Sequence, residues 1–182
     1  MLLHELALQG RTNIYSSMAA GIVNKLLEVR KDIIKESLGD FQNVEHRLEF
    51  VTRVHGIEFI NDSKATNANS AWYALESMTK PVIWIVGGKD NLCDYDSLLP
   101  LVKQKVKAIV CLGLESSRIH EAFSGIVSEI VDSENAEEAV KLAYNLGRNG
   151  DVVLLSPASA SFEMFDNYED RGHKFKEAVR EL

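Results

Sequence analysis

One short segment of the chain brings together many groups that can bind or polarise a ligand. Residues 61–67 read Asn-Asp-Ser-Lys-Ala-Thr-Asn, so a carboxylate, an ammonium, two hydroxyls and two amides lie close together. The segment follows an apolar run that ends at Ile60 and opens a helical pattern, and a helix N-terminus attracts anions. A single capping residue there would be ordinary. Because Lys64 is unfavourable beside the positive end of a helix, we predict that this segment binds a ligand.

A second polar segment follows the last long apolar run. Residues 155–162 read Leu-Ser-Pro-Ala-Ser-Ala-Ser-Phe, and Phe165, Asn167, Tyr168 and Arg171 come soon after. Hydroxyls beside aromatic rings and a guanidinium suit a polar ligand that also has some apolar surface. A serine-rich helix cap is the alternative interpretation, because serine commonly caps helices. We favour ligand binding.

Two further segments carry weaker signals. Residues 87–91 read Gly-Gly-Lys-Asp-Asn; glycine allows close backbone approach to a ligand, and Lys89 could meet an anion. Residues 112–117 are predicted to be an ordinary turn from a strand to a helix. The sequence contains no P-loop, no GxGxxG, no HExxH and no serine-histidine-aspartate pattern with an elbow glycine. It therefore predicts a binding surface without a phosphate cradle.

The hydrophobic pattern after His46 predicts the elements that position these segments. Residues 48–54 and 57–60 read as two strands joined by a turn at His55 and Gly56. Further strands are predicted at residues 81–86, 106–112, 127–131 and 151–155, with helices at 67–78, 95–103, 116–123, 134–147 and 168–181. This alternation predicts an α/β fold with a doubly wound, mostly parallel, Rossmann-like sheet. Ligands of such sheets gather at the carboxyl ends of the strands, where the polar segments fall.

The N-terminal residues follow a different pattern. Apolar residues recur at helical spacing across residues 13–29 and again across 30–41, which predicts a pair of helices. Two helices without a third layer cannot close a hydrophobic core. We therefore interpret residues 1–43 as the helical tail of another domain and residues 44–182 as one domain.

Composition narrows the classes of protein and partner. The 182 residues carry a net charge of -7, which argues against a nucleic-acid partner. The longest apolar runs are much shorter than the roughly 20 residues that a membrane helix needs, and we see no signal peptide. Cys93 and Cys111 lack metal-binding spacing. We therefore expect free thiols in a reducing cytosol, with no zinc and no membrane contact.

Four segments of the sequence together resemble the Mur ligase family. They are residues 46–49 (His-Arg-Leu-Glu), 61–67, 156–162 and 167–172 (Asn-Tyr-Glu-Asp-Arg-Gly). The chain is most similar to the branch that adds D-glutamate in peptidoglycan synthesis. Residues 10–20 look like the end of that family's central ATPase domain. The family's nucleotide-sugar domain and P-loop have no counterpart here, so the resemblance implies a fragment of a bacterial cytoplasmic enzyme.

The resemblance also implies roles for single residues. Arg47, Asp62 and Asn13 would contact ATP. D-glutamate would be surrounded by Lys64, which would also be catalytic, and by Thr66, Ser161, Phe162, Tyr168 and Lys89. In the family's reaction, ATP phosphorylates the carboxylate of a nucleotide-sugar peptide, and the amine of D-glutamate attacks the acyl phosphate. The magnesium ligands belong to the missing central domain, so this chain is expected to be inactive alone and to work with the N-terminal and central domains in cis.

Several positions depart from the family pattern. Thr12 stands where a histidine is usual, and Ser16 where an asparagine is frequent, both in the part that would meet the nucleotide. Asn91 stands where a basic residue often meets a glutamate carboxylate, and Lys89 is the nearest residue that could replace it. Ser159 takes the place of a frequent cysteine, which is a small change.

Three other interpretations stay open on the sequence alone. The first is another ligase of the same superfamily, such as a folylpolyglutamate synthase; residues 61–67 argue against it, because such relatives carry Asp-Tyr-Ala-His at the centre of this segment. The second is a noncatalytic module that senses a nucleotide or an amino acid, which predicts measurable binding by the chain alone. A purely structural α/β domain fits the polar loops least well.

Overall fold

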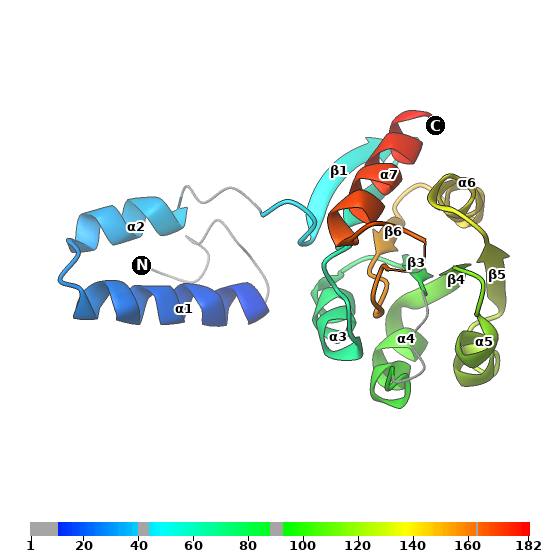
Figure 1. Ribbon diagram of the computed structural model, residues 1–182, viewed down its shortest axis with the longest axis horizontal. Helices are drawn as coiled ribbons and strands as arrows, with labels where there is room; N and C mark the ends of the chain where they lie inside the picture. Colours follow the sequence, from blue (N-terminus) through cyan, green and yellow to red (C-terminus); the bar gives the residue numbers. More distant parts are fainter. Residues whose placement is uncertain (1–10, 40–43, 88–92, 163) are drawn as a thin grey trace. The chain divides into compact units, whose positions relative to one another are not determined.

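The computed structural model describes residues 11–39, 44–87, 93–162 and 164–182, and the side chains of residues 11–13 and 37–39 are not described. The chain divides into two compact units, Met1–Val44 and Glu45–Leu182. Figure 1 shows the elements of each unit. Among the described residues, no helix is long and apolar enough to span a membrane.

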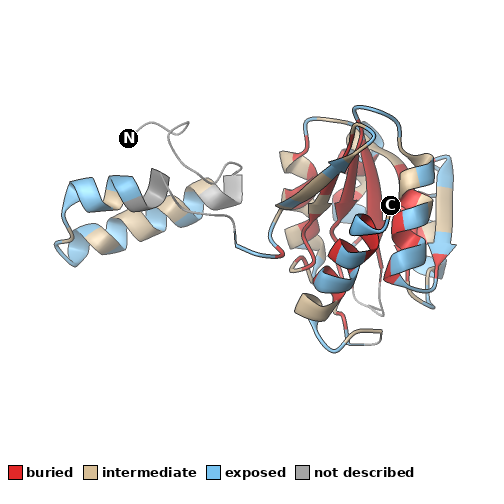
Figure 2. Ribbon diagram, turned by 90° about the horizontal axis from the view of Figure 1, so that it is seen from above, coloured by how far each residue is buried: buried red, intermediate tan, exposed pale blue. Residues whose placement is uncertain are grey.

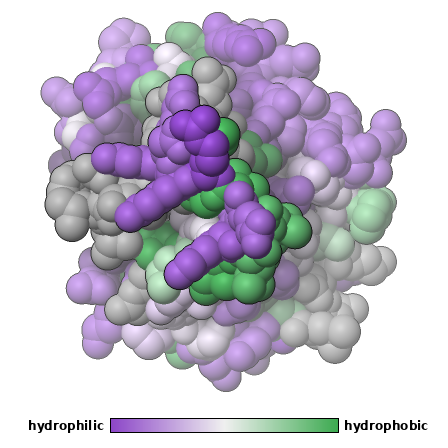
Figure 3. All heavy atoms as spheres, turned by 90° about the vertical axis from the view of Figure 1, so that its left-hand side faces the viewer, coloured by the Kyte–Doolittle hydropathy of each residue, from purple (hydrophilic) through white to green (hydrophobic). Residues whose placement is uncertain are grey.

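The first unit contains the two predicted helices. They are α1 (Arg11–Leu26) and α2 (Lys31–Gly39), and they contact each other. None of residues 14–36 is buried (Figure 2). Among residues 14–36, seven large apolar side chains are exposed: Tyr15, Met18, Ile22, Val23, Leu26, Leu27 and Ile33. Figure 3 shows green apolar side chains at the surface among purple polar ones. Such a pair needs further apolar surface to form a core, and its assignment to an ATPase domain stays a prediction.

The second unit is built on one six-stranded sheet. Its strands are β1 (Glu49–Val54), β2 (Ile57–Asn61), β3 (Val82–Val86), β4 (Val106–Leu112), β5 (Glu129–Ser133) and β6 (Val152–Leu155). They lie in the order β1-β2-β6-β3-β4-β5, and every neighbouring pair is parallel except β1 and β2. His55 and Gly56 turn β1 into β2 with φ angles of 47° and 85°, as a tight two-residue hairpin turn requires. The predicted mostly parallel α/β sheet is confirmed.

Helices cover both faces of this sheet (Figures 1 and 2). They are α3 (Ala68–Ser77), α4 (Leu99–Lys105) after a 3₁₀ turn at Asp96–Leu98, α5 (Ser117–Phe123), α6 (Ala136–Leu146) and α7 (Tyr168–Arg180). Helices α3, α4 and α5 pack on the face that carries Trp84 and Ile109. Helices α6 and α7 pack on the face that carries Ile83 and Val110. The central strands are therefore apolar on both sides, as their sequences indicate.

The predicted start of the fifth strand was wrong. β5 begins at Glu129 and not at Val127. The N–H of Val127 donates to the carbonyl of Phe123 at 2.9 Å, so Val127 still belongs to the turn that closes α5. Because Val127 is buried in the core beside α5, its apolar side chain extended the pattern that predicted the strand.

The strand order brings the polar segments together. β6 lies between β2 and β3, so the carboxyl ends of these three strands, at Leu155, Asn61 and Val86, are neighbours. The segments that follow them include residues 61–67 and 155–162. These segments meet at the edge of the sheet where parallel α/β folds bind their ligands.

Candidate functional site

Hydrogen bonds outside the sheet join the loops that follow β2, β3 and β6. The N–H of Ala158 donates to the carbonyl of Ala65 at 2.9 Å. The hydroxyl of Ser159 donates to the carbonyl of Gly87 at 2.5 Å. Gly87 has a φ of 133°, and a Cβ at this position would lie 2.6 Å from the carbonyl oxygen of Leu112, so the close approach requires glycine. The three loops therefore form one connected surface.

Arg171, from α7, donates hydrogen bonds to two of these loops, those that follow β2 and β6. Its Nε donates to Ser63 Oγ at 3.0 Å and its Nη2 to the Ser63 carbonyl at 2.8 Å. Its Nη1 reaches the carbonyls of Ser159 at 3.2 Å and Ala160 at 3.4 Å. The side chain is 1% exposed, and this burial lowers the pKa of Arg171 to about 10. The suggestion that Arg171 recognises a ligand was therefore wrong, because its donors point inward, to backbone carbonyls and to the Ser63 hydroxyl.

Lys64 and Tyr168 contact each other next to Ser63, which Arg171 binds. Lys64 Nζ donates to the Tyr168 hydroxyl at 3.1 Å and lies 4.9 Å from the centre of the phenol ring. The neighbouring Ser63 hydroxyl donates to the Tyr168 carbonyl at 2.7 Å, which fixes the start of α7 against this loop. Asn167 caps α7 by accepting from the N–H of Asp170 at 2.7 Å. Two residues that the resemblance assigns to D-glutamate are thus brought into contact.

Asp62 is held in a nearly closed environment at the end of β2. Its carboxylate accepts from the N–H of Leu48 at 3.2 Å and from the hydroxyl of Ser156 at 3.1 Å. The residue is 7% exposed, and burial raises its pKa from 3.8 to about 7, against the lowering effect of these two bonds and of the Arg47 charge. Asp62 can therefore change its protonation state near neutral pH.

Arg47 lies beside Asp62 in a distorted segment. It stands between His46 and Leu48, whose φ angles are 64° and 43°. The carbonyl of His46 accepts from the N–H of Lys64 at 3.1 Å. Arg47 itself is exposed. The structure thus brings Arg47, Asp62 and Lys64 to one corner of the surface, with the guanidinium open to a ligand.

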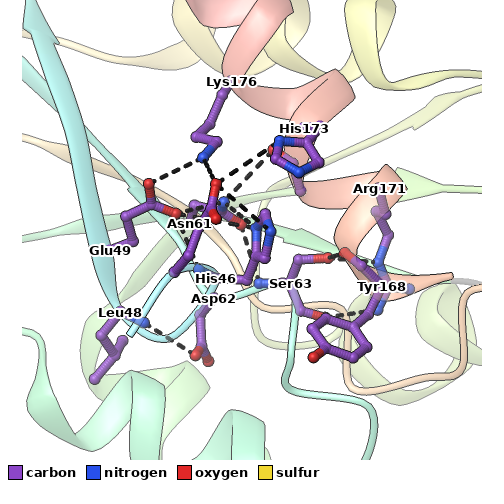
Figure 4. A network of polar contacts seen from close by, with 12 residues as sticks. His46, Leu48, Glu49, Asn61, Asp62, Ser63, Tyr168, Arg171, His173 and Lys176 are labelled. Atoms are coloured by element: carbon purple, nitrogen blue, oxygen red, sulfur yellow. Dashed lines mark hydrogen bonds and ion pairs between the residues drawn. The ribbon is translucent and has the colours of Figure 1, made fainter. Parts of the chain in front are cut away.

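A polar network fixes this distorted segment to the sheet and to α7 (Figure 4). The Asn61 Nδ2 donates to His46 Nδ1 at 2.9 Å and to Glu49 Oε2 at 3.0 Å, while Asn61 Oδ1 accepts from the N–H of Ser63 at 3.1 Å. Lys176, from α7, donates to Glu49 Oε1 at 3.1 Å. Because Asn61 donates to Nδ1, the neutral His46 ring carries its hydrogen on Nε2. Burial lowers the pKa of His46, which favours this neutral form.

Gly172 lets α7 approach this network. A Cβ on Gly172 would lie 2.2 Å from His46 Nδ1, so we expect Gly172→Ala to lower the free energy of unfolding by about 1–3 kcal/mol through overpacking. Gly21→Ala is the matched control, because Gly21 also lies in a helix and a Cβ there meets no described atom within 4 Å. Urea unfolding measures both variants. A Gly172→Ala protein as stable as the parent would show that α7 is free to move away.

The remaining predicted site residues lie as follows. Thr66 is half-buried after the loop turn, Ser161 is 4% exposed and Phe162 is 79% exposed. Asn13 lies in α1, but its side chain is outside the described part of the chain. Lys89 lies outside the described residues altogether, as does Asn91, whose role it was suggested to replace.

Sequence reasoning missed the support beneath the site. Asn61 and Glu49 stand inside two of the segments that carry the resemblance, but no role was predicted for either. Lys176 gave no signal, because a lysine in an amphipathic helix usually lies in solvent, whereas here it is 9% exposed. Its partner Glu49 is 127 positions away in the sequence.

Comparison with protein families gives a match within the second unit. The model described as "Mur ligase, glutamate ligase domain" matches residues 46–159. The chain is 56% identical over 178 residues to the UDP-N-acetylmuramoylalanine–D-glutamate ligase of Christiangramia forsetii, covering 98% of this chain and 40% of the relative. The same enzyme of Porphyromonas gingivalis is 49% identical, covering 97% of this chain and 39% of the relative. The chain thus spans about 40% of the length of these curated relatives.

Solved structures show the same fold. The UDP-N-acetylmuramate-alanine ligase of Thermotoga maritima matches with a TM-score of 0.71 at 15% identity, covering 97% of this chain and 39% of that protein. A bifunctional folylpolyglutamate synthase/dihydrofolate synthase of Yersinia pestis matches with a TM-score of 0.58 at 18% identity, covering 84% of this chain and 35% of that protein. At these identities the likeness concerns the fold alone.

Proposed function

The chain belongs to the Mur ligase family, and on this basis we propose that it carries the glutamate-accepting domain of an ATP-dependent ligase that adds D-glutamate to UDP-N-acetylmuramoyl-L-alanine. The names of the relatives at 49–56% identity support this choice of substrate. ATP as the phosphoryl donor would place the reaction in the bacterial cytoplasm.

The observation that carries the proposal is the corner formed by Lys64, Tyr168, Arg47 and Asp62. The Lys64 ammonium contacts the hydroxyl and the ring of Tyr168, and it suits an anionic ligand such as a glutamate carboxylate. Arg47 is open to solvent and suits a phosphate, which a guanidinium can bind through two parallel bonds. One corner can thus receive an amino-acid carboxylate and a phosphate side by side.

Each further residue has a role in this scheme. The Thr66 and Ser161 hydroxyls would bind the D-glutamate carboxylates, and Phe162 would cover the ligand. Asp62 would meet the ribose of ATP, and Asn13 and Lys89 are proposed contacts from outside the described site. The phosphate cradle and the magnesium ligands would come from the central domain of the complete enzyme. Phosphoryl transfer depends on positioning and charge neutralisation, so the reaction would begin only when the domains close together.

Lys64→Ala in the complete enzyme is the first test. We expect at least a tenfold loss of turnover, about 1.4 kcal/mol of transition-state stabilisation, together with a raised KM for D-glutamate. Arg47→Ala is expected to cut turnover as strongly while raising the KM for ATP instead. Lys80→Ala, which removes a surface lysine paired with Glu58 at 2.9 Å, is the matched control and should leave both constants unchanged. Unchanged kinetics in Lys64→Ala would remove this residue from the site.

A further inference from the structure

A second group of reactive side chains lies on the other side of the sheet's centre, over β4 and β5. Cys111 and Asp132 are register partners on these neighbouring parallel strands, so their side chains point to the same face. Helix α5 covers that face through Ile119, which belongs to the same core cluster as Cys111. The same helix carries His120. A thiol, a carboxylate and an imidazole are thereby gathered from three elements.

Their ligating atoms lie close enough to share one ion. All three atoms lie within 4.8 Å of one another. His120 Nε2 and Asp132 Oδ1 are 3.0 Å apart, and the Cys111 thiol is hydrogen-bonded to the same carboxylate. Four ligands around a tetrahedral zinc ion, at about 2.0–2.3 Å from the metal, stand roughly 3.3–3.6 Å from one another. Small side-chain movements would bring the three ligating atoms to these separations, so that the group could hold an ion.

We propose that Cys111, His120 and Asp132 form a binding site for one divalent transition-metal ion of the zinc class. Thiolate and imidazole ligands select zinc over magnesium or calcium, which prefer oxygen. The Cys111 thiol releases its proton to solvent as the sulfur–metal bond forms. Three protein ligands leave a fourth position for water or another small ligand.

A metal ion could enter this site from the side that faces solvent. The Cys111 side chain is 1% exposed and closes the back of the site. The side chains of His120 and Asp132 are 37% and 56% exposed and face solvent at the edge strand β5. A bound ion would link β4, β5 and α5. It would therefore stabilise the half of the sheet that lies away from the corner formed by Lys64, Tyr168, Arg47 and Asp62.

An alternative interpretation is that Cys111 is a nucleophile, and the arrangement of the three side chains argues against it. A nucleophilic cysteine needs the imidazole as its direct base. Here the Asp132 carboxylate accepts from both the thiol and the imidazole, so it stands between them. Burial also raises the pKa of the Cys111 thiol, which disfavours a free thiolate.

A second trio with ligating atoms, Glu45, His46 and His173, is less suited to a metal. The ammonium of Lys176 already bonds to the Glu45 carboxylate. The hydrogen of the neutral His46 ring sits on Nε2, as its bond from Asn61 requires, so this nitrogen has no lone pair to offer. Glu45, His46 and His173 are therefore the alternative location for a metal ion, and the experiment has to distinguish it from the site at Cys111.

Cobalt titration of the chain tests the proposal, since cobalt bound to a thiolate gives a charge-transfer absorption band in the near ultraviolet. We expect one cobalt ion per chain, with the band removed by zinc and absent from Cys111→Ser. His120→Ala and Asp132→Asn should each weaken zinc binding at least tenfold. Cys93→Ser and His173→Ala are the controls and should keep the band and the affinity.

Several outcomes would overturn the proposal. They are the absence of a thiolate band in the folded parent chain, its persistence in Cys111→Ser, or its loss in Cys93→Ser or His173→Ala. If Cys111→Ser does not fold, His120→Ala and Asp132→Asn decide the question, because both change exposed side chains. Zinc affinity unchanged in these two folded variants would also contradict the site. The measurement needs no ligase activity, so it stands apart from the proposed function.

Discussion

Arg171→Ala should lower the free energy of unfolding by about 4 kcal/mol, the largest loss that we expect from one substitution in this chain. The guanidinium donates to three backbone carbonyls and to the Ser63 hydroxyl. Alanine would leave these buried acceptors without their donor, and each unsatisfied group costs about 1–3 kcal/mol where water cannot replace it. It would also leave a cavity, because Arg171 is among the largest fully buried side chains.

Urea unfolding of the variant measures this effect. Arg171→Lys keeps a positive charge but loses the planar fork, so its stability should lie between those of the parent and the alanine variant. Arg180→Ala, on the exposed side of the same helix, is the matched control and should change stability by no more than about 0.5 kcal/mol. A loss below 1 kcal/mol in Arg171→Ala would show that the loops do not depend on this side chain.

Asp62→Asn should stabilise the chain above neutral pH, by up to about 4 kcal/mol. The pKa of Asp62 is raised from 3.8 to about 7, and this difference converts to about 4 kcal/mol at 1.36 kcal/mol per pKa unit. Between these two values the folded state keeps a proton that the unfolded state has released. Asp62 therefore lowers stability progressively as pH rises from about 4 to about 7, and the loss is complete above that range. Asparagine removes the charge and can still accept from the N–H of Leu48.

The comparison needs the free energy of unfolding of both proteins at pH 5, 6, 7 and 8. The difference between Asp62→Asn and the parent should grow with pH up to about 7 and then stay constant. Asp166→Asn removes an exposed carboxylate and should follow the parent at every pH. A difference that does not change with pH would mean that Asp62 is ionised throughout, and would contradict the closed environment described for it.

The sequence predicted the elements well because their physical signals are local. Apolar runs at strand length and the helical spacing between them need only neighbouring residues. β5 was predicted two residues early, through the buried Val127, and the helix predicted at 95–103 is a 3₁₀ turn at Asp96–Leu98 followed by α4 at Leu99–Lys105. The location of residues 61–67 and 155–162 at one edge followed from the general rule for parallel sheets. Their contact depends on β6 lying between β2 and β3, an order that no local pattern contains.

Other features of the site depend on contacts between residues far apart in the chain. Arg171 looked like a ligand contact in sequence because a guanidinium beside hydroxyls and aromatic rings suits a polar ligand, and only the packing of α7 turns it inward. The partnership of Lys176 with Glu49, and that of Cys111 with Asp132, require the three-dimensional arrangement of separate elements. Cysteine spacing alone cannot report an imidazole and a carboxylate that α5 and β5 bring close to Cys111.

The most direct test of the proposed addition of D-glutamate is phosphate release from ATP by the complete enzyme, supplied with magnesium and UDP-N-acetylmuramoyl-L-alanine. We expect release that requires D-glutamate, is not supported by L-glutamate, and falls at least tenfold in Lys64→Ala. The chain alone should release none. Release that another amino acid supports equally well, or that the isolated chain performs unaided, would contradict the assignment of this domain as the receiver of D-glutamate.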